Sequence, residues 1–142
     1  MLAARRDQYD TASPQVRFVA DYLRHEVLDK LSVNQRTFLL RTSVLRRMSS
    51  GLCDALVGRS DSAARLDELE RAGLFIRPVG GGRVWYSYHA AFRETLLAEL
   101  ERSEPEAVRS QLHQEASQWY ERSDMPEEAV EHALLAGDAA RA

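Results

Sequence analysis

Two short strand-like segments flank a run of three glycines at positions 80–82, and they limit the folds open to this chain. Residues 74–78 have the pattern of a short strand, and residues 84–88 are rich in aromatic and β-branched side chains. The glycine run suits a tight hairpin tip. It is not a phosphate-binding loop, because the Lys-Ser/Thr pair and the strand-to-helix context of such a loop are missing. The pattern predicts one β-hairpin in an otherwise helical chain.

Three short helical segments precede the hairpin, between about residues 34 and 72. Their ends are marked by residue types that helix termini favour, which are Ser32 with Gln35, Ser49 and Ser50, Ser60 or Asp61, Gly58 and Gly73. Ser32 and Gln35 have the spacing of a capping box, and glycine suits the residue that ends many helices. Three helices followed directly by a two-stranded wing are typical of a winged helix.

The segment ahead of these helices divides at Pro14. Residues 1–14 carry few apolar anchors, and we expect them to be a leader or linker. From residue 15 to about residue 30, apolar side chains recur at spacings of three and four, as in an amphipathic helix. The predicted stripe consists of Val16, Val19, Leu23 and Val27, widened by Phe18 and Tyr22.

The chain after the hairpin is helical in pattern. The apolar period of a helix returns at His89, and Pro105 stands near the start of the next helix, where proline is tolerated. Pro126 opens a last helix, which we expect Gly137 to end. The last two helices should form an antiparallel pair, whose apolar face needs another repeat to cover it.

We therefore predict a mainly α fold made of two parts. Residues 15–103 form a winged-helix domain, with three helices, a β-hairpin wing and a preceding linker helix. Residues 104–142 form the start of TPR-like helical repeats. The charge divides near the same junction, because residues 1–103 carry a net charge of +3 and residues 104–142 carry −6. A chain of 142 residues is long enough to bury a core.

The sequence contains little that points to catalysis. The lone cysteine, Cys53, excludes an intrachain disulfide and a cysteine zinc site, and we expect it to be a buried small apolar residue. The four histidines show no metal-ligand spacing, and His113 and His132 are expected on solvated faces. We predict a non-catalytic protein without a metal. The absence of a membrane-length apolar run and of a signal-peptide pattern leads us to expect a cytoplasmic protein that does not bind membranes.

The third helix of a winged helix often enters the DNA major groove, so its charge is informative. Residues 61–71 carry four acidic and two basic side chains. The carboxylates closest to a phosphate backbone would be Asp67, Glu68 and Glu70. DNA binding needs cations that release counterions, and the wing offers only Arg77 and Arg83. A protein-packing role is favoured, with a stand-alone DNA-binding winged helix and a helical protein-interaction module as the alternatives.

The segment Tyr88-His89-Ala90-Ala91-Phe92-Arg93-Glu94-Thr95-Leu96-Leu97 opens the helix after the wing. It resembles the Tyr-His-x-Leu-Phe-Arg-x-Leu-Leu signature of the large ATP-binding LuxR-type regulators. These form the MalT-like family, among the signal-transduction ATPases with numerous domains. Further similar segments lie at residues 18–28, 38–45, 66–75, 119–120 and 129–134. The resemblance covers nearly all of residues 15–140.

The resemblance implies a role in a conformational switch. In such regulators, the winged helix folds against the nucleotide-binding domain, and a histidine at the start of its last helix contacts the β-phosphate of ADP. His89 occupies that position, at a helix N-terminus suited to an anion, and Arg93 lies one turn on as a supporting residue. The alternative is that His89 only caps the helix and packs under the wing. Ala90 and Ala91 depart from the family pattern.

The resemblance also sets expectations for cofactors and partners. The 142 residues contain no Walker motif, so we expect no cofactor in this segment itself, while ADP or ATP is implied for the intact regulator. The expected partner is the nucleotide-binding domain of the same regulator, with self-association as a further expectation. The segment would relay a signal between an ATPase domain and a helical sensor domain.

Overall fold

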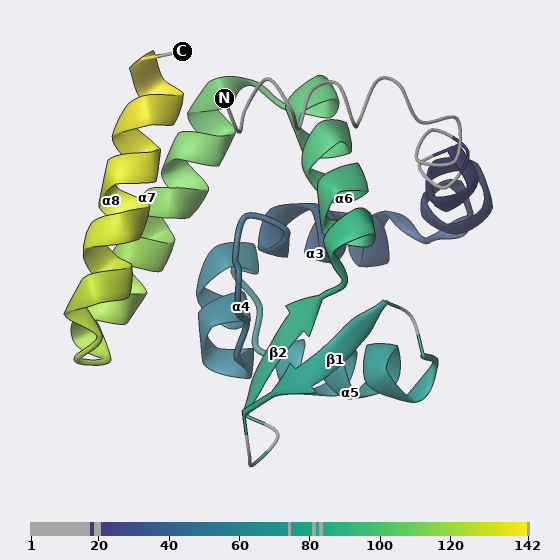
Figure 1. The fold of residues 1–142 in the computed structure, drawn as a ribbon, viewed down its shortest axis with the longest axis horizontal. Helices are drawn as coiled ribbons and strands as arrows, with labels where there is room; N and C mark the ends of the chain where they lie inside the picture. Colours follow the sequence, from purple (N-terminus) through teal and green to yellow (C-terminus); the bar gives the residue numbers. More distant parts are fainter. Residues whose placement is uncertain (1–17, 19–20, 74, 81, 83, 142) are drawn as a thin grey trace.

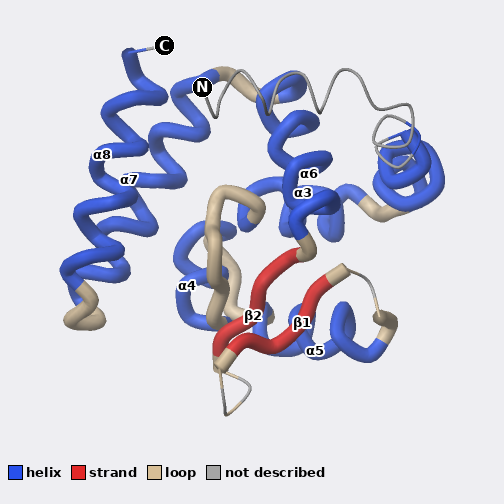
Figure 2. The backbone as a smooth tube through the Cα atoms, viewed as in Figure 1, coloured by secondary structure: helices blue, strands red, loops and turns tan. Residues whose placement is uncertain are grey.

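The fold is a set of short helices around a small two-stranded wing, with a pair of longer helices packed on one side (Figure 1). The computed structural model describes residue 18 and residues 21–73, 75–80, 82 and 84–141, and side chains up to residue 137. Figure 2 shows the two strands as the only extended segments of this part of the chain. The mainly α fold predicted from the sequence is confirmed. The predicted leader, residues 1–14, lies outside the described residues.

The three helices before the wing have the predicted order. They are α3 (Val33–Thr42), α4 (Ser50–Val57) and α5 (Ser62–Arg71). Ser32 and Gln35 form the predicted capping box at α3, with N–O distances of 3.2 and 3.0 Å. Ser49 Oγ accepts a hydrogen bond from the Leu52 amide and caps α4. Gly58 ends α4 with φ +70°, a conformation that favours glycine.

The segment before α3 packs only a narrow apolar face. It contains a π-helical turn, η1 (Leu23–Val27), and a 3-10 turn, η2 (Leu28–Lys30). Leu23 and Leu28 are buried, but Phe18 and Tyr22 are 72% and 51% exposed. The prediction that Phe18 and Tyr22 widen the stripe is therefore wrong. The turn η1 contacts α6, and the buried face follows Leu23 and Leu28 rather than the neighbouring positions. Val16 and Val19 lie outside the described residues.

The wing consists of β1 (Ile76–Val79) and β2 (Trp85–Tyr88), which pair antiparallel with Ile76 opposite Tyr88. The first strand begins later than the predicted residue 74. Phe75 adopts a left-handed conformation, with φ +62°, which interrupts extended backbone just before β1. Met48 and Tyr86 exchange backbone hydrogen bonds of 2.7 and 2.8 Å, so the α3–α4 connection is also fastened to the wing.

The remaining helices are α6 (Ala90–Ser103), α7 (Glu106–Arg122) and α8 (Pro126–Arg141). The helices α7 and α8 are antiparallel, because Ser110 Oγ bonds the Ala136 carbonyl and Ser117 Oγ bonds the Ala129 carbonyl. The prediction that Gly137 ends the last helix is wrong, since α8 continues to Arg141. A glycine inside a helix costs about 1 kcal/mol relative to alanine, which is too little to end a helix.

One continuous core joins these elements. Its fully buried side chains come from the linker turns, α3, the α3–α4 connection, α4, α5, α6 and α7, and include Leu28, Leu45, Met48, Leu52, Leu66, Phe92, Leu96, Leu100 and Leu112. Cys53 is buried in this core, as predicted, and burial raises the pKa of its thiol far above the ordinary value. Among the described residues, no helix is long and apolar enough to cross a membrane.

Candidate functional site

His89 stands at the turn between the wing and α6. Its backbone N–H donates to the Phe75 carbonyl at 2.8 Å, and its carbonyl accepts from the Arg93 amide at 2.9 Å. The imidazole makes no capping hydrogen bond to α6 and is exposed. The backbone of His89 is therefore fixed on both sides, whereas its ring faces solvent at the N-terminus of a helix.

Phe75, whose carbonyl accepts the hydrogen bond from the His89 amide, has a strained backbone. Phe75 has φ +62°, and a bulky side chain in this region costs on the order of 1–3 kcal/mol. Its ring stacks on Phe92 of α6, with the ring centroids 4.8 Å apart. The stack and the hydrogen bond to His89 keep this conformation in place. The start of α6 is thus set by contacts from the residue before β1 and from α6 itself.

Arg93 lies one turn after His89, but its guanidinium is engaged elsewhere. Nε donates to the Ser43 carbonyl at 2.9 Å and Nη2 donates to the Val44 carbonyl at 3.3 Å. These carbonyls follow α3, whose C-terminus attracts a cation. Burial, followed by the charge of Arg46, lowers the pKa of Arg93 from its ordinary value. No hydrogen bond joins the side chains of His89 and Arg93, both of which are described.

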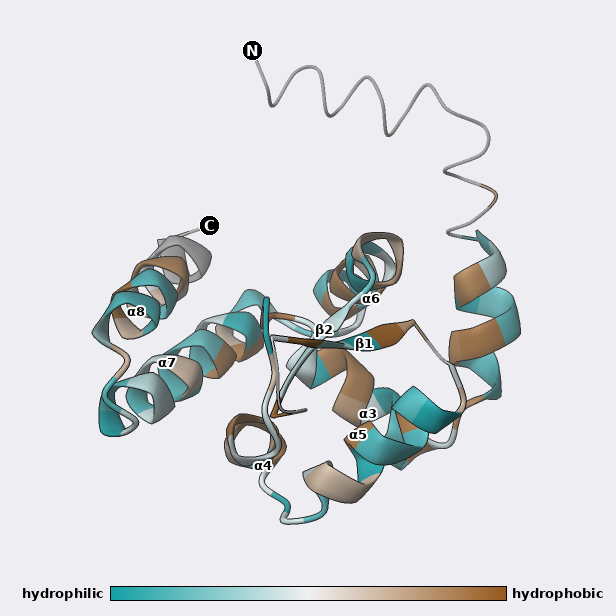
Figure 3. Cartoon of the chain, turned by 60° about the horizontal axis from the view of Figure 1, so that its bottom comes forward, coloured by the Kyte–Doolittle hydropathy of each residue, from teal (hydrophilic) through white to brown (hydrophobic). Residues whose placement is uncertain are grey.

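The helix α5 keeps its acidic character in the folded chain. Arg65 pairs with Asp61 at 3.3 Å, and Arg71 pairs with Asp67 at 3.2 Å, so both arginines of this helix neutralise carboxylates of the same helix or its cap. Most of α5 is coloured as hydrophilic in Figure 3. The net charge of −2 over residues 61–71 therefore remains on this helix.

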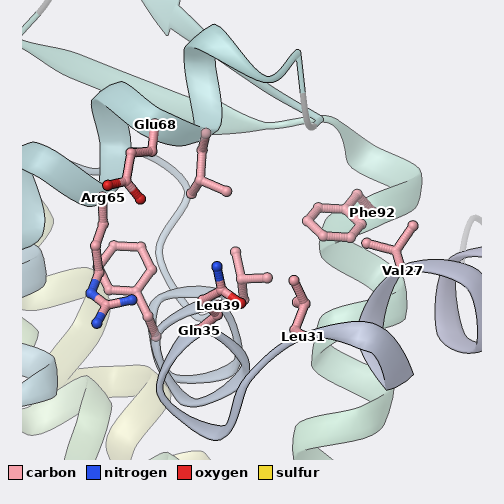
Figure 4. Close-up of a pocket in the computed structure, with 9 residues that line it drawn as sticks. Val27, Leu31, Gln35, Leu39, Arg65, Glu68 and Phe92 are labelled. Atoms are coloured by element: carbon pink, nitrogen blue, oxygen red, sulfur yellow. The ribbon is translucent and has the colours of Figure 1, made fainter.

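A small apolar cavity lies between the linker turns, α3, α5 and α6 (Figure 4). Its volume is about 50 Å³, and its lining is mainly apolar: Val27, Leu31, Phe38, Leu39, Leu69 and Phe92, with Gln35, Arg65 and Glu68 as its polar residues. Ligand pockets usually enclose roughly 300–1,000 Å³. This cavity is therefore a packing gap rather than a nucleotide site.

The wing and the α7–α8 pair meet through a stack of aromatic rings. Trp85 of β2 stacks on Tyr120 of α7, with centroids 6.3 Å apart and planes 5° apart. Tyr120 stacks in turn on His132 of α8 at 5.5 Å. Trp119 meets Trp85 edge-on at 6.1 Å. Such aromatic pairs contribute about 0.5–1.5 kcal/mol each beyond their burial.

Two ion pairs join the α3–α4 connection to α8 beside this stack. Arg46 pairs with Glu131 at 3.4 Å, and Arg47 pairs with Glu128 at 3.2 Å. The Arg47 guanidinium also lies 5.0 Å from the centre of the Trp85 ring. A polar pocket of about 250 Å³ lies beside these ion pairs. It is lined by Arg46, Arg47, Tyr120, Glu127, Glu128, Glu131 and His132. We call the two ion pairs and the aromatic stack together the wing–pair junction.

The structure corrects the prediction for two histidines. His113 and His132 are expected on solvated faces, but their Nδ1 atoms lie 2.9 Å apart between α7 and α8, and His132 is only 5% exposed. Burial is the largest cause that lowers the pKa of His113, to about 4, and it also lowers the pKa of His132. The sequence does contain a helical signal for this, because His113 stands three residues before the buried Ala116 and His132 three after the buried Ala129.

Comparisons with known proteins agree with this architecture. Residues 24–108, which run from η1 through the wing and α6 into the first turn of α7, match the model of the MalT winged helix domain. The protein named serine/threonine-protein kinase PknK is 40% identical over 124 residues, in Mycobacterium tuberculosis strain H37Rv and in Mycobacterium bovis. The alignment covers 87% of this chain and 11% of the relative, so the chain spans about a tenth of the length of these proteins. With more than half of its residues matched, this chain belongs to the MalT winged helix domain family.

Proposed function

We propose that this chain is a non-catalytic regulatory segment of a MalT-like transcriptional regulator of the LuxR type. It acts as a conformational switch between an ATPase domain and a helical sensor domain that begins with α7 and α8. The domain match over residues 24–108 supports the regulatory role. The kinase activity in the name of the mycobacterial relatives belongs to proteins of which the alignment covers 11%, and we do not extend it to this segment.

The observation that carries the proposal is the continuity between the wing–pair junction and His89. Trp85 contacts Tyr120 of α7 at one end of β2, and the other end of β2 leads through Tyr88 directly into His89. A displacement of α7 and α8 therefore acts on the same short strand that positions the start of α6. Packed elements of this kind shift between discrete arrangements rather than deforming continuously.

His89 is the residue through which the segment contacts ADP held in the partner ATPase domain. Its ring is exposed beside the first amides of α6, which have no acceptor within the helix. Such a helix N-terminus suits the negative charge of a diphosphate. Arg93 supports the site indirectly, because its guanidinium holds α6 to the carbonyls after α3. Ala90 and Ala91 add no polar side chain, so the imidazole is the main side-chain donor.

The test is His89→Ala in the intact regulator, with measurement of ADP retention and of basal transcription. We expect faster loss of ADP and higher basal transcription, because the resting state loses a contact. His25→Ala is the matched control, since His25 is an exposed histidine that pairs with Asp29 one helical turn away. Unchanged ADP retention and unchanged transcription in His89→Ala would refute the proposed switch.

A second candidate function is a helical protein-interaction module, favoured by the outer face of α8. Val130, Leu134 and Leu135 are 59%, 66% and 39% exposed there, which is unusual for large apolar side chains on one helix. Self-association through this face predicts a sedimentation coefficient that rises with concentration and that Leu134→Glu returns to the monomer value. A coefficient independent of concentration would remove this candidate.

A further inference from the structure

His113 and His132 form a pair whose geometry depends on protons. Their Nδ1 atoms lie 2.9 Å apart, so one ring donates its N–H and the other accepts with a lone pair. The rings also stack, with centroids 5.2 Å apart. The hydrogen bond forms only when one facing Nδ1 is free of a proton. Protonation of both rings places two N–H groups and two positive charges against each other.

The surroundings disfavour additional positive charge at this pair. The groups that face it come from its own helices, from α6 and from the α3–α4 connection, and they are Arg109 and Tyr120 of α7, Glu128 and Glu131 of α8, Arg93 of α6 and Arg46. Arg109 Nε is buried without a hydrogen-bond partner in the described structure. The carboxylates of Glu128 and Glu131 are shared with Arg47 and Arg46, so they offset only part of the repulsion.

We propose that the His113–His132 pair is a proton-sensitive latch that fastens α8 to α7 at neutral pH and releases it on acidification. The release changes the packing at the wing–pair junction, because His132 stacks on Tyr120 and Tyr120 stacks on Trp85. This inference does not need His89 or a nucleotide. It adds a second input to the relay that we propose between α7–α8 and the wing, and it is tested independently of that relay.

The direction of the pH effect follows from the buried state of the rings. The pKa of His113 is lowered from 6.5 to about 4 in the closed arrangement, mainly by burial, and the pKa of His132 is lowered as well. The open or unfolded chain therefore binds more protons between about pH 6.5 and pH 4. The closed arrangement is fully stable above this window and loses stability as the pH falls through it. Burial raises the pKa of Tyr120 to about 12, so Tyr120 stays neutral throughout.

The chain carries a natural reporter of this event. Its two tryptophans, Trp85 and Trp119, both lie at the wing–pair junction. We therefore suggest following intrinsic fluorescence and thermal unfolding of the full 142-residue chain from about pH 7.5 to about pH 4.5, across the titration window. In the wild type we expect a shift in tryptophan emission, and a fall of roughly tenfold in the closed-to-open ratio between about pH 7 and about pH 5. The midpoint of unfolding should fall by about 3–5 °C.

The variants His113→Gln and His132→Gln, made singly, keep a polar side chain but cannot titrate. Each single variant keeps one buried histidine, so it should lose only part of the emission shift and of the pH-dependent fall in the unfolding midpoint. The double variant His113→Gln/His132→Gln should lose most of both, whereas the control His25→Gln should keep both. An NMR titration of the wild-type histidine rings needs no variant, and it should find the His113 ring neutral at about pH 5.5. An ordinary pKa for His113, or a wild-type pH profile in the double variant His113→Gln/His132→Gln, would overturn the latch.

Discussion

Thr42 and Tyr88 show at the scale of single residues how the wing is held to the first helix of the domain. Thr42 Oγ1 lies 2.7 Å from Tyr88 OH, and the Thr42 hydroxyl donates to the Phe38 carbonyl at 2.8 Å. Both side chains are buried, with exposures of 0% and 4%. Since the proton of Thr42 is used by Phe38, Tyr88 is the donor to Thr42. Burial raises the pKa of Tyr88 well above its ordinary value, so the Tyr88 hydroxyl stays protonated and remains a donor.

Thr42→Val should lower the free energy of unfolding by about 1–3 kcal/mol, because it leaves the Tyr88 hydroxyl buried without an acceptor. The double variant Thr42→Val/Tyr88→Phe removes both hydroxyls. It should be more stable than Thr42→Val alone, since no polar group is then left unsatisfied. Urea denaturation of the wild type, both single variants and the double variant measures the coupling. Strictly additive losses would contradict this pairing.

At the scale of elements, local signals were predictable from the sequence and contacts between distant segments were not. The capping box of Ser32 and Gln35 and the left-handed Gly58 depend on neighbouring residues, and the sequence patterns identify them correctly. The stack of Trp85 on Tyr120 joins residues far apart in the chain, and no local pattern shows it. The pattern of each helix places its histidine one turn from a buried alanine, but the pairing of His113 with His132 depends on both helices at once. The sequence therefore points to His89 and misses the junction.

The helix α4 packs against α7 through a glycine. A Cβ placed on Gly51 would lie 3.5 Å from Cζ2 and Nε1 of Trp119, which is an ordinary contact distance. Gly51 has no left-handed backbone that would exclude alanine. Gly73, after α5, differs because its φ is +69°, although a Cβ placed there would meet nothing within 4 Å.

Gly51→Ala should therefore stabilise the chain by about 0.5 kcal/mol, because alanine lowers the backbone entropy lost in the helix and fills space beside Trp119. Gly73→Ala should destabilise it by about 1 kcal/mol, because alanine is strained at positive φ. Thermal and urea unfolding of the two variants should give changes of opposite sign. Destabilisation by both would show that the contact with Trp119 has no room for a methyl group.

For the whole molecule, the net charge changes sign near the start of α7. Residues 1–103 carry a net charge of +3, and residues 104–142 carry −6. Arg46 with Glu131 and Arg47 with Glu128 are contacts in which these charges meet. Exposed ion pairs of this kind contribute only about 0–1 kcal/mol each. They help to orient the helix pair, whose packing comes from the contact of α7 with α4 as well as from the aromatic stack.

The same charge distribution bears on nucleic-acid binding. In a winged helix that reads DNA, α5 would approach the phosphates, and here its arginines are already paired with Asp61 and Asp67. Binding would require carboxylates to enter the field of the phosphate backbone. Apart from the two arginines of α5, the described basic residues before α7 are spread over the linker turns, α3, the connections before and after α4, β1 and α6.

We therefore expect the chain not to shift duplex DNA at about 10 µM protein and about 0.1 M salt, conditions under which non-specific DNA-binding domains commonly bind. The variant Asp67→Asn/Glu68→Gln removes two charges from α5 and should gain at most weak binding that disappears as salt is raised. Electrophoretic mobility shift and fluorescence anisotropy with a labelled duplex measure both. A salt-dependent shift by the wild-type chain at this concentration would show that the acidic α5 is not the surface that meets DNA, and would return the DNA-binding winged helix as the leading interpretation.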